Sequence, residues 1–163
     1  MKKIITILAL LLMTITASAQ FQKGKAYLGA SLTGLNMYYN SHNGLSLGVE
    51  AKAGYMFVDN WMLLGEASVN HNGSDGAADY VTVGAGLRYY IIQNGLYLGL
   101  NAKFIHADHN YNDVMPSVEI GYAFYLNRSV TIEPAAYYDH SFNDCSYSTV
   151  GLKVGLGIYL FDD

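Results

Sequence analysis

After its first twenty residues the chain alternates apolar and polar positions with a period of two. Successive side chains of a β-strand point to opposite faces of a sheet, so this alternation predicts strands with one apolar and one polar face. The pattern recurs in eight segments, and no helical periodicity competes with it. The predicted strands cover residues 25–35, 44–57, 61–70, 80–91, 96–105, 117–126, 130–139 and 148–161.

The connections between these segments alternate between short and long. Three are tight and rich in residues that tolerate turn dihedrals, at 58–60, 92–95 and 127–129. Four are longer and polar, centred on 36–43, 71–79, 106–114 and 140–147. Short turns on one side and long extracellular loops on the other are typical of outer-membrane barrels. The pattern therefore predicts an all-β fold, an eight-stranded antiparallel up-and-down transmembrane β-barrel.

The first residues have the order of features found in an export signal. Lys2 and Lys3 precede an apolar run over 4–15, and the small residues of 17–19 follow it. The run is shorter than the roughly 20 residues that a spanning helix needs, which argues against a membrane anchor. We therefore predict a cleaved signal peptide over residues 1–19 and a single barrel domain over 20–163.

Composition and charge support export and a barrel. Charged residues make up 13% of the chain, against about a quarter of a typical soluble domain, too few to coat a surface in water. Loss of Lys2 and Lys3 with the signal changes the formal charge from −4 to −6, and an acidic chain without a basic patch predicts no nucleic-acid partner. Cys145 is the only cysteine, so an internal disulfide and a thiolate zinc site are excluded.

The two faces of the strands distinguish a membrane barrel from a soluble, lipocalin-like one, which would point its apolar face inward. The polar face carries about one mid-strand charge per strand, with small residues between the charges, which suits a narrow lumen better than open solvent. These predicted lumen charges are Glu50, Lys52, Glu66, Arg88, Lys103, Glu119, Glu133 and Lys153.

The apolar face carries aromatic residues near the short turns, as expected for rings at a membrane interface. This predicted aromatic girdle consists of Tyr55, Phe57, Trp61, Tyr89, Tyr122 and Phe124. Toward the long loops, an opposite girdle could begin at Tyr38, Tyr39, Phe104 and Tyr138.

The predicted lumen charges are four acidic and four basic residues, so they can neutralise one another. Eight strands leave an interior just wide enough for side chains, and buried charges are tolerated when they are paired. Counting from the short turns, we expect Lys52 to meet Glu66, and Lys103 to meet Glu119 deeper in the barrel, at a depth similar to Lys153 and Glu50. The prediction is a charge-plugged lumen; a proton or ion pathway is the alternative interpretation.

The signal, the eight alternating strands, the turn asymmetry and the closing segment 155–161 resemble the small outer-membrane β-barrel family of OmpA-type and OmpX-type domains. The resemblance covers the whole mature chain. It implies location in the bacterial outer membrane, lipid around the barrel, and recognition by the barrel insertion machinery during assembly. The assembly signal that it implies is Leu152, Val154, Leu156, Ile158, Leu160 and Phe161; here Asp162 and Asp163 follow the final aromatic.

Two groups of loop residues could carry chemistry. His106, Asp108, His109 and Asp113 supply imidazole and carboxylate ligands for a surface zinc or copper site, although polar loops also collect such residues for turns and solvation. We therefore predict no metal and no cofactor.

Ser41 beside His42, and His140 between Asp139 and Ser141, supply the residue types of a hydrolase that acts on lipid A or phospholipid. No activating motif surrounds either serine. We therefore expect a non-enzymatic barrel that presents four extracellular loops for envelope integrity, surface interaction or adhesion. A small-solute channel and a lipid-modifying enzyme at the outer rim are the alternatives, and Cys145 is given no role.

Overall fold

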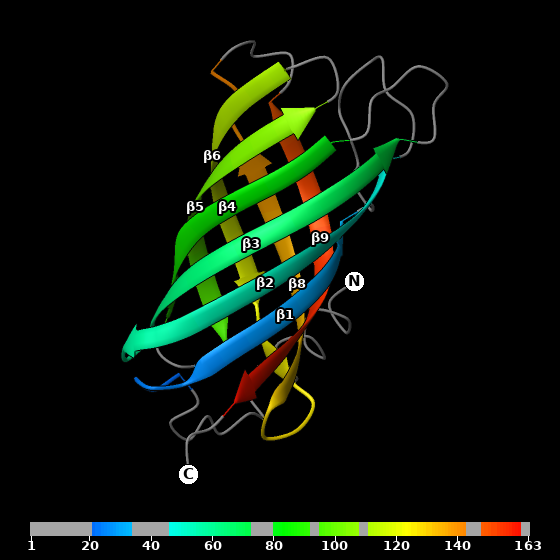
Figure 1. The fold of residues 1–163 in the computed structure, drawn as a ribbon. Helices are drawn as coiled ribbons and strands as arrows, with labels where there is room; N and C mark the ends of the chain where they lie inside the picture. Colours follow the sequence, from blue (N-terminus) through cyan, green and yellow to red (C-terminus); the bar gives the residue numbers. More distant parts are fainter. Residues whose placement is uncertain are drawn as a thin grey trace, which may run out of the picture.

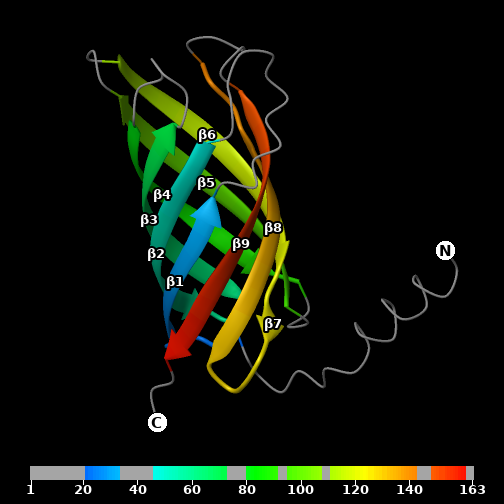
Figure 2. The ribbon, with the colours of Figure 1, turned by 90° about the vertical axis from the view of Figure 1, so that its right-hand side faces the viewer.

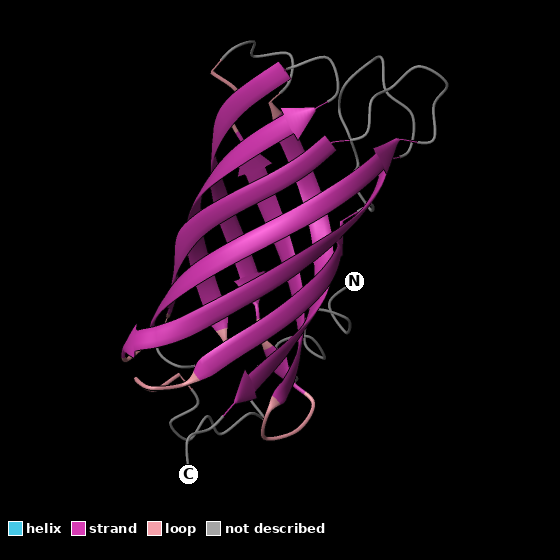
Figure 3. Ribbon diagram, in the orientation of Figure 1, coloured by secondary structure: helices cyan, strands magenta, loops and turns pink. Residues whose placement is uncertain are grey.

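The computed structural model describes residues 21–33, 46–72, 80–91, 95–107, 111–142 and 148–160. These residues form one antiparallel sheet of strongly tilted strands that closes into a barrel (Figures 1 and 3). The strands are β1 Ala26–Thr33, β2 Ser46–Val58, β3 Trp61–Asn72, β4 Tyr80–Tyr90, β5 Leu96–Ala107, β6 Tyr111–Tyr122, β7 Phe124–Tyr125, β8 Val130–Asp139 and β9 Thr149–Leu160. Within the described ranges, no helix is long and apolar enough to cross a membrane.

The barrel closes because β1 pairs with both β2 and β9, and β6 pairs with both β5 and β8. β6 and β7 are two parts of one strand, since Gly121 lies opposite Ala135 and Phe124 opposite Ile132 in the same alignment. Continuing that alignment puts Pro134 at the break, and proline has no N–H to donate to the ladder. With β6 and β7 counted together, the predicted eight-stranded antiparallel barrel is confirmed.

The described short turns, at 59–60 between β2 and β3 and at 126–129 between β7 and β8, lie at the end of the barrel where β1 begins and β9 ends, which we name the short-turn end (Figure 2). Asn60 ends the first turn with a φ of 65°, and Gly95 precedes β5 with a φ of 94°. Both values lie in the left-handed region that asparagine and glycine tolerate. In the third turn the Asn127 side-chain oxygen accepts hydrogen bonds from the N–H groups of Ser129 and Val130, at 2.9 and 2.8 Å.

One predicted loop is wrong. Residues 106–114 were expected to form a long connection, but β5 and β6 pair as far as Ala107 and Tyr111. His106, Asn112 and Asp113 therefore belong to strands that extend past the predicted strand ends. A strand can continue through polar residues because its pairing depends on backbone hydrogen bonds to the neighbouring strand, not on the polarity of the side chains.

Side chains sort by face as the alternation predicts. The apolar residues point outward, with Leu32 70% and Leu100 64% exposed, while the polar set faces the interior. This is the reverse of a lipocalin-like barrel. The interior is therefore where charged and aromatic side chains meet.

Candidate functional site

A cluster of buried aromatic and apolar side chains, which we name the aromatic floor, fills the short-turn end of the lumen. Phe21 is fully buried, stacks on Tyr90 with ring centroids 3.8 Å apart, and meets the edge of Tyr159 at 5.7 Å. Backbone bonds hold it there, because the Asn60 N–H donates to the Phe21 carbonyl at 2.8 Å. The other buried members of this floor are Tyr27, Met56, Met62, Leu64, Tyr97, Ala123 and Ala135, with Tyr125 packed against them.

The floor was not predicted from the sequence, because Phe21 lies before position 25, outside the predicted strands. The available signal was the aromatic Phe21 directly after the predicted cleavage site, followed by Gly24, whose φ of 94° turns the chain into β1. A strand periodicity cannot detect such a residue, since it lies before the first strand.

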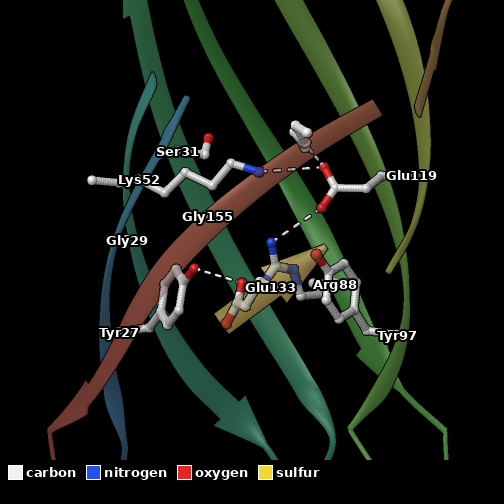
Figure 4. A pocket seen from close by; sticks show the side chains of 11 residues that line it. Tyr27, Gly29, Ser31, Lys52, Arg88, Tyr97, Glu119, Glu133 and Gly155 are labelled. Atoms are coloured by element: carbon white, nitrogen blue, oxygen red, sulfur yellow. Dashed lines mark hydrogen bonds and ion pairs between the residues drawn. The ribbon is translucent and has the colours of Figure 1, made fainter. Parts of the chain in front are cut away.

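Glu133 is buried and accepts several hydrogen bonds; Figure 4 shows its carboxylate beside Tyr27 and Arg88. Its carboxylate accepts bonds from the Tyr27 hydroxyl at 2.8 Å and from Nη1 of Arg88 at 2.9 Å. The hydroxyls of Thr131 and Tyr159 donate to its other oxygen at 2.9 and 3.1 Å. Four donors satisfy one buried carboxylate, which is the condition for tolerating its charge.

Arg88 connects this group to a second carboxylate. Its Nη2 lies 3.2 Å from Glu119, and its guanidinium carbon lies 3.9 Å from the centre of the Tyr97 ring. The side chain is 1% exposed. Two carboxylates and an aromatic face therefore surround the most buried cation of the described lumen.

A cluster of lysines and carboxylates fills the next part of the lumen. Lys52 lies 3.3 Å from both Glu50 and Glu119, and 3.6 Å from its cross-strand partner Glu66. Lys153 pairs with Glu119 and, at 3.5 Å, with Glu50. The structure thus gathers seven of the eight predicted lumen charges into one connected network.

The eighth predicted charge has a different partner. Lys103 binds Asp139 at 3.0 Å, so the expected pair of Lys103 with Glu119 is wrong. The register explains the error: Leu96 lies opposite Tyr122, not Leu126, and this places Met115 across from Lys103 and Glu119 across from Gly99.

Asp139 is a ninth charge that the sequence reasoning placed on the polar face of its strand but did not include in the network. Asp139 brings the paired charges of the described lumen to four basic and five acidic side chains, and a fifth basic side chain, Lys25, is also buried directly before β1. Between Tyr27, Arg88, Glu119, Glu133 and Lys153 there remains a cavity of about 10 Å³, roughly the space of one water molecule.

The outside of the barrel is apolar around its whole circumference. Large apolar side chains that are at least 40% exposed come from every wall of the barrel, among them Leu28, Val49, Leu63, Val83, Leu100, Val118, Tyr138 and Leu156. A continuous belt of this kind is not stable in water, whereas lipid tails solvate it. The strands are therefore membrane-spanning strands.

Comparisons with known proteins agree with this architecture. No protein-family model and no curated protein matches the chain. Among solved structures, Ail, the attachment invasion locus protein of Yersinia pestis, in a phospholipid bilayer nanodisc, matches with a TM-score of 0.60 and 14% identity, covering 85% of this chain and 100% of that one. Neisserial surface protein A matches at 0.55 and 13%, covering 82% and 95%. De novo designed transmembrane β-barrels match at 0.55 and 14%, covering 85% and 98%.

The chain has the fold of the small outer-membrane β-barrels. At these identities the likeness is one of fold, and it extends over nearly the full length of each of these structures.

The aromatic residues predicted for the girdle of this outer-membrane barrel lie on its outer face near the short-turn end. Trp61 packs against Tyr89 with ring centroids 4.8 Å apart, and Tyr122 against Phe124 at 4.3 Å. Tyr55 and Phe57 are 51% and 41% exposed. Toward the other end, Phe104 and Tyr138 also face outward, whereas Tyr38 and Tyr39 lie outside the described residues.

The predicted assembly signal lies on the outer face of β9. Its described members are all between 43% and 56% exposed: Leu152, Val154, Leu156, Ile158 and Leu160. Phe161 lies outside the described residues, as does the predicted signal peptide.

The structure does not bring the side chains of Asp139, His140 and Ser141 together as a hydrolase site would require. Asp139 points inward to Lys103, and Ser141 is 1% exposed. His140 instead contacts the Tyr138 hydroxyl and Ser148, at 3.3 and 3.5 Å through Nδ1. Consecutive residues of a strand alternate faces, so a neighbour in sequence is not a neighbour in space. Ser41 and His42 lie outside the described residues.

The residues proposed as metal ligands at 106–113 do not lie together in one long loop. His106 belongs to β5 and Asp113 to β6, where the register pairs them with Asn112 and Ile105 instead of with each other. Asp108 and His109 lie outside the described residues, and the part of the chain that the structure describes contains no group of three or more His, Cys, Asp or Glu side chains able to hold a metal ion.

Proposed function

We propose that this protein is a non-enzymatic barrel of the bacterial outer membrane that anchors extracellular loops, with a lumen closed by its own side chains. The observation that carries the proposal is the filled interior: a network of buried ion pairs above an aromatic floor, with a residual cavity of about 10 Å³. An interior of this kind contributes rigidity and leaves no path for a solute.

A small-solute channel is the functional alternative, and conductance separates the two. Purified protein reconstituted in a planar bilayer is expected to show no stable single-channel currents, because the hydrogen-bonded Arg88 and Glu133 side chains extend into the lumen from opposite walls and meet there. Reproducible open states of one amplitude, growing in number with the amount of protein, would contradict the closed lumen.

We further propose that residues 1–19 are removed on export and that the barrel insertion machinery recognises the exposed apolar face of β9. The mature chain would then begin at Gln20, one residue before the buried Phe21. Amino-terminal sequencing of protein from the outer-membrane fraction checks the cleavage site. Migration on a denaturing gel with and without boiling checks the barrel, since a folded barrel changes its mobility on heating.

The loops are proposed to serve envelope integrity, surface interaction or adhesion. Two proteins with this fold are named as an attachment invasion locus protein and as a surface protein, which supports a surface role for the loops. Variants in which each long loop is replaced by a short turn should still show the heat-dependent gel shift but lose binding of whole cells to host-cell surfaces. Unchanged cell binding by such variants would contradict a role for the loops in adhesion.

A further inference from the structure

The segment directly before β1, residues 21–25, reaches from β1 to distant walls of the barrel, and we name it the strap. Its first residue, Phe21, is fully buried. The Phe21 ring contacts the rings of Tyr90 on β4, Tyr125 on β7 and Tyr159 on β9, with centroid distances of 3.8, 5.7 and 5.7 Å. In the sheet order, β4 and β7 each lie three strand-to-strand steps from β1, in opposite directions. One side chain therefore joins three separate parts of the wall.

Backbone hydrogen bonds attach the strap to the end of β2 and to the turn that follows it. The Gly24 N–H donates to the Met56 carbonyl at 2.8 Å, and the Met56 N–H donates to the Lys25 carbonyl at 2.9 Å. The Lys23 N–H donates to a side-chain oxygen of Asp59 at 2.8 Å. The strap is therefore fixed along its length, and its path across the end of the lumen is defined by bonds as well as by the buried ring.

The strap also supports the hydrogen-bonded groups inside the barrel. Tyr90 and Tyr159 contact Phe21 with their rings, and their hydroxyl groups lie 2.6 Å apart. The Tyr159 hydroxyl donates to Glu133 at 3.1 Å, and Nη1 of Arg88 donates to the Tyr90 hydroxyl at 3.3 Å. The two tyrosines that hold the strap by their rings therefore belong to the lumen network by their hydroxyls.

The contacts of the strap require a closed barrel. Tyr125 and Tyr159 lie in the last third of the chain, and Phe21 reaches Tyr159 when β1 is paired with β9. Contacts between residues far apart in sequence carry a loop-closure cost, which makes them form late in folding. The strap is therefore expected to dock after the wall has closed.

We propose that the strap is a latch that docks last in folding and keeps the closed barrel from opening. An interaction that is absent from the folding transition state leaves the folding rate unchanged, whereas its loss accelerates unfolding. Separation of β1 from β9 would break the ring contacts of Phe21 with Tyr159, so the latch slows this separation. The latch is independent of what the loops do and of whether the barrel conducts.

Unfolding and refolding rates of the full mature protein in detergent micelles test the latch. Urea-jump experiments followed by the fluorescence of Trp61, the single tryptophan, give both rates. Phe21→Ala should accelerate unfolding by at least about 100-fold and change the refolding rate by less than about threefold. Phe104→Ala is the matched control, since it makes the same deletion at an outward side chain that is 49% exposed. It should accelerate unfolding by less than about tenfold.

Phe21→Leu keeps the latch testable if Phe21→Ala does not fold, because leucine retains much of the apolar volume without the ring. It should accelerate unfolding by about tenfold and leave the refolding rate unchanged. The latch is supported if the larger of the two rate changes lies in unfolding. It is overturned if the larger change lies in refolding, which would make the strap an early-folding element, or if neither rate changes.

Discussion

Arg88 on β4 and Glu133 on β8 meet inside the barrel at 2.9 Å, although three strand-to-strand steps separate them around the wall. Both are nearly inaccessible to solvent, at 1% and 4% exposure. Such a pair ties distant parts of the sheet together, so its loss should affect the whole barrel.

The first prediction concerns this pair. Glu133→Gln should lower the free energy of unfolding by about 3 kcal/mol, because it leaves a buried guanidinium short of one carboxylate. Urea unfolding in detergent, followed by the fluorescence of the single tryptophan Trp61, measures it. The double variant Arg88→Met with Glu133→Gln should lose less than the sum of the single variants; strict additivity would show that the two side chains are not coupled.

The second prediction concerns a glycine that faces the lumen. Gly121→Ala should cost about 1–3 kcal/mol through overpacking, since the new Cβ would lie 2.4 Å from the Tyr97 ring and 2.8 Å from the Ala135 Cβ. Gly65→Ala is the matched control, because the new Cβ faces outward and its nearest neighbour, the Ala53 carbonyl oxygen, is 4.0 Å away. The same urea experiment compares them, and equal stability of the two variants would refute the packing assignment.

The third prediction tests the lipid-facing surface. Leu100→Arg, at a side chain 64% exposed on the middle of β5, should destabilise the membrane-inserted barrel by about 2–4 kcal/mol. The fraction folded in lipid vesicles, read from the heat-dependent gel shift, reports the loss. Leu100→Met should fold like the parent. A barrel that faced water at this position would tolerate the arginine, so normal folding of Leu100→Arg would exclude a lipid contact there.

The fourth prediction concerns the aromatic floor. Phe21→Ala should cost about 3–5 kcal/mol, the range for removing a fully buried phenylalanine, because the ring is 0% exposed and stacked on Tyr90. The exposed neighbour Gln22 gives the control variant Gln22→Ala, which should unfold at the parent's urea concentration. If Phe21→Ala did the same, the segment before β1 would not contribute to the stability of the barrel.

Much of the fold could be predicted from residues close together in the chain. Which face of each strand points into the lumen follows from the two-residue period, and Lys52 with Glu66 could be matched because they flank one short turn. The extension of β5 and β6 through His106 and Asp113 could not be predicted, because polar side chains alone do not show where backbone pairing ends.

By itself the sequence determined the number of strands, their antiparallel order and the sorting of side chains between lipid and lumen, because each depends on local alternation and short turns. Only the tertiary structure decided the partners within the lumen. Lys103 bonds Asp139 instead of Glu119, and Phe21 becomes the floor beneath Tyr90. The physical reason is closure: the register of every strand pair and the tilt of the barrel together set which side chains from distant strands come within bonding distance.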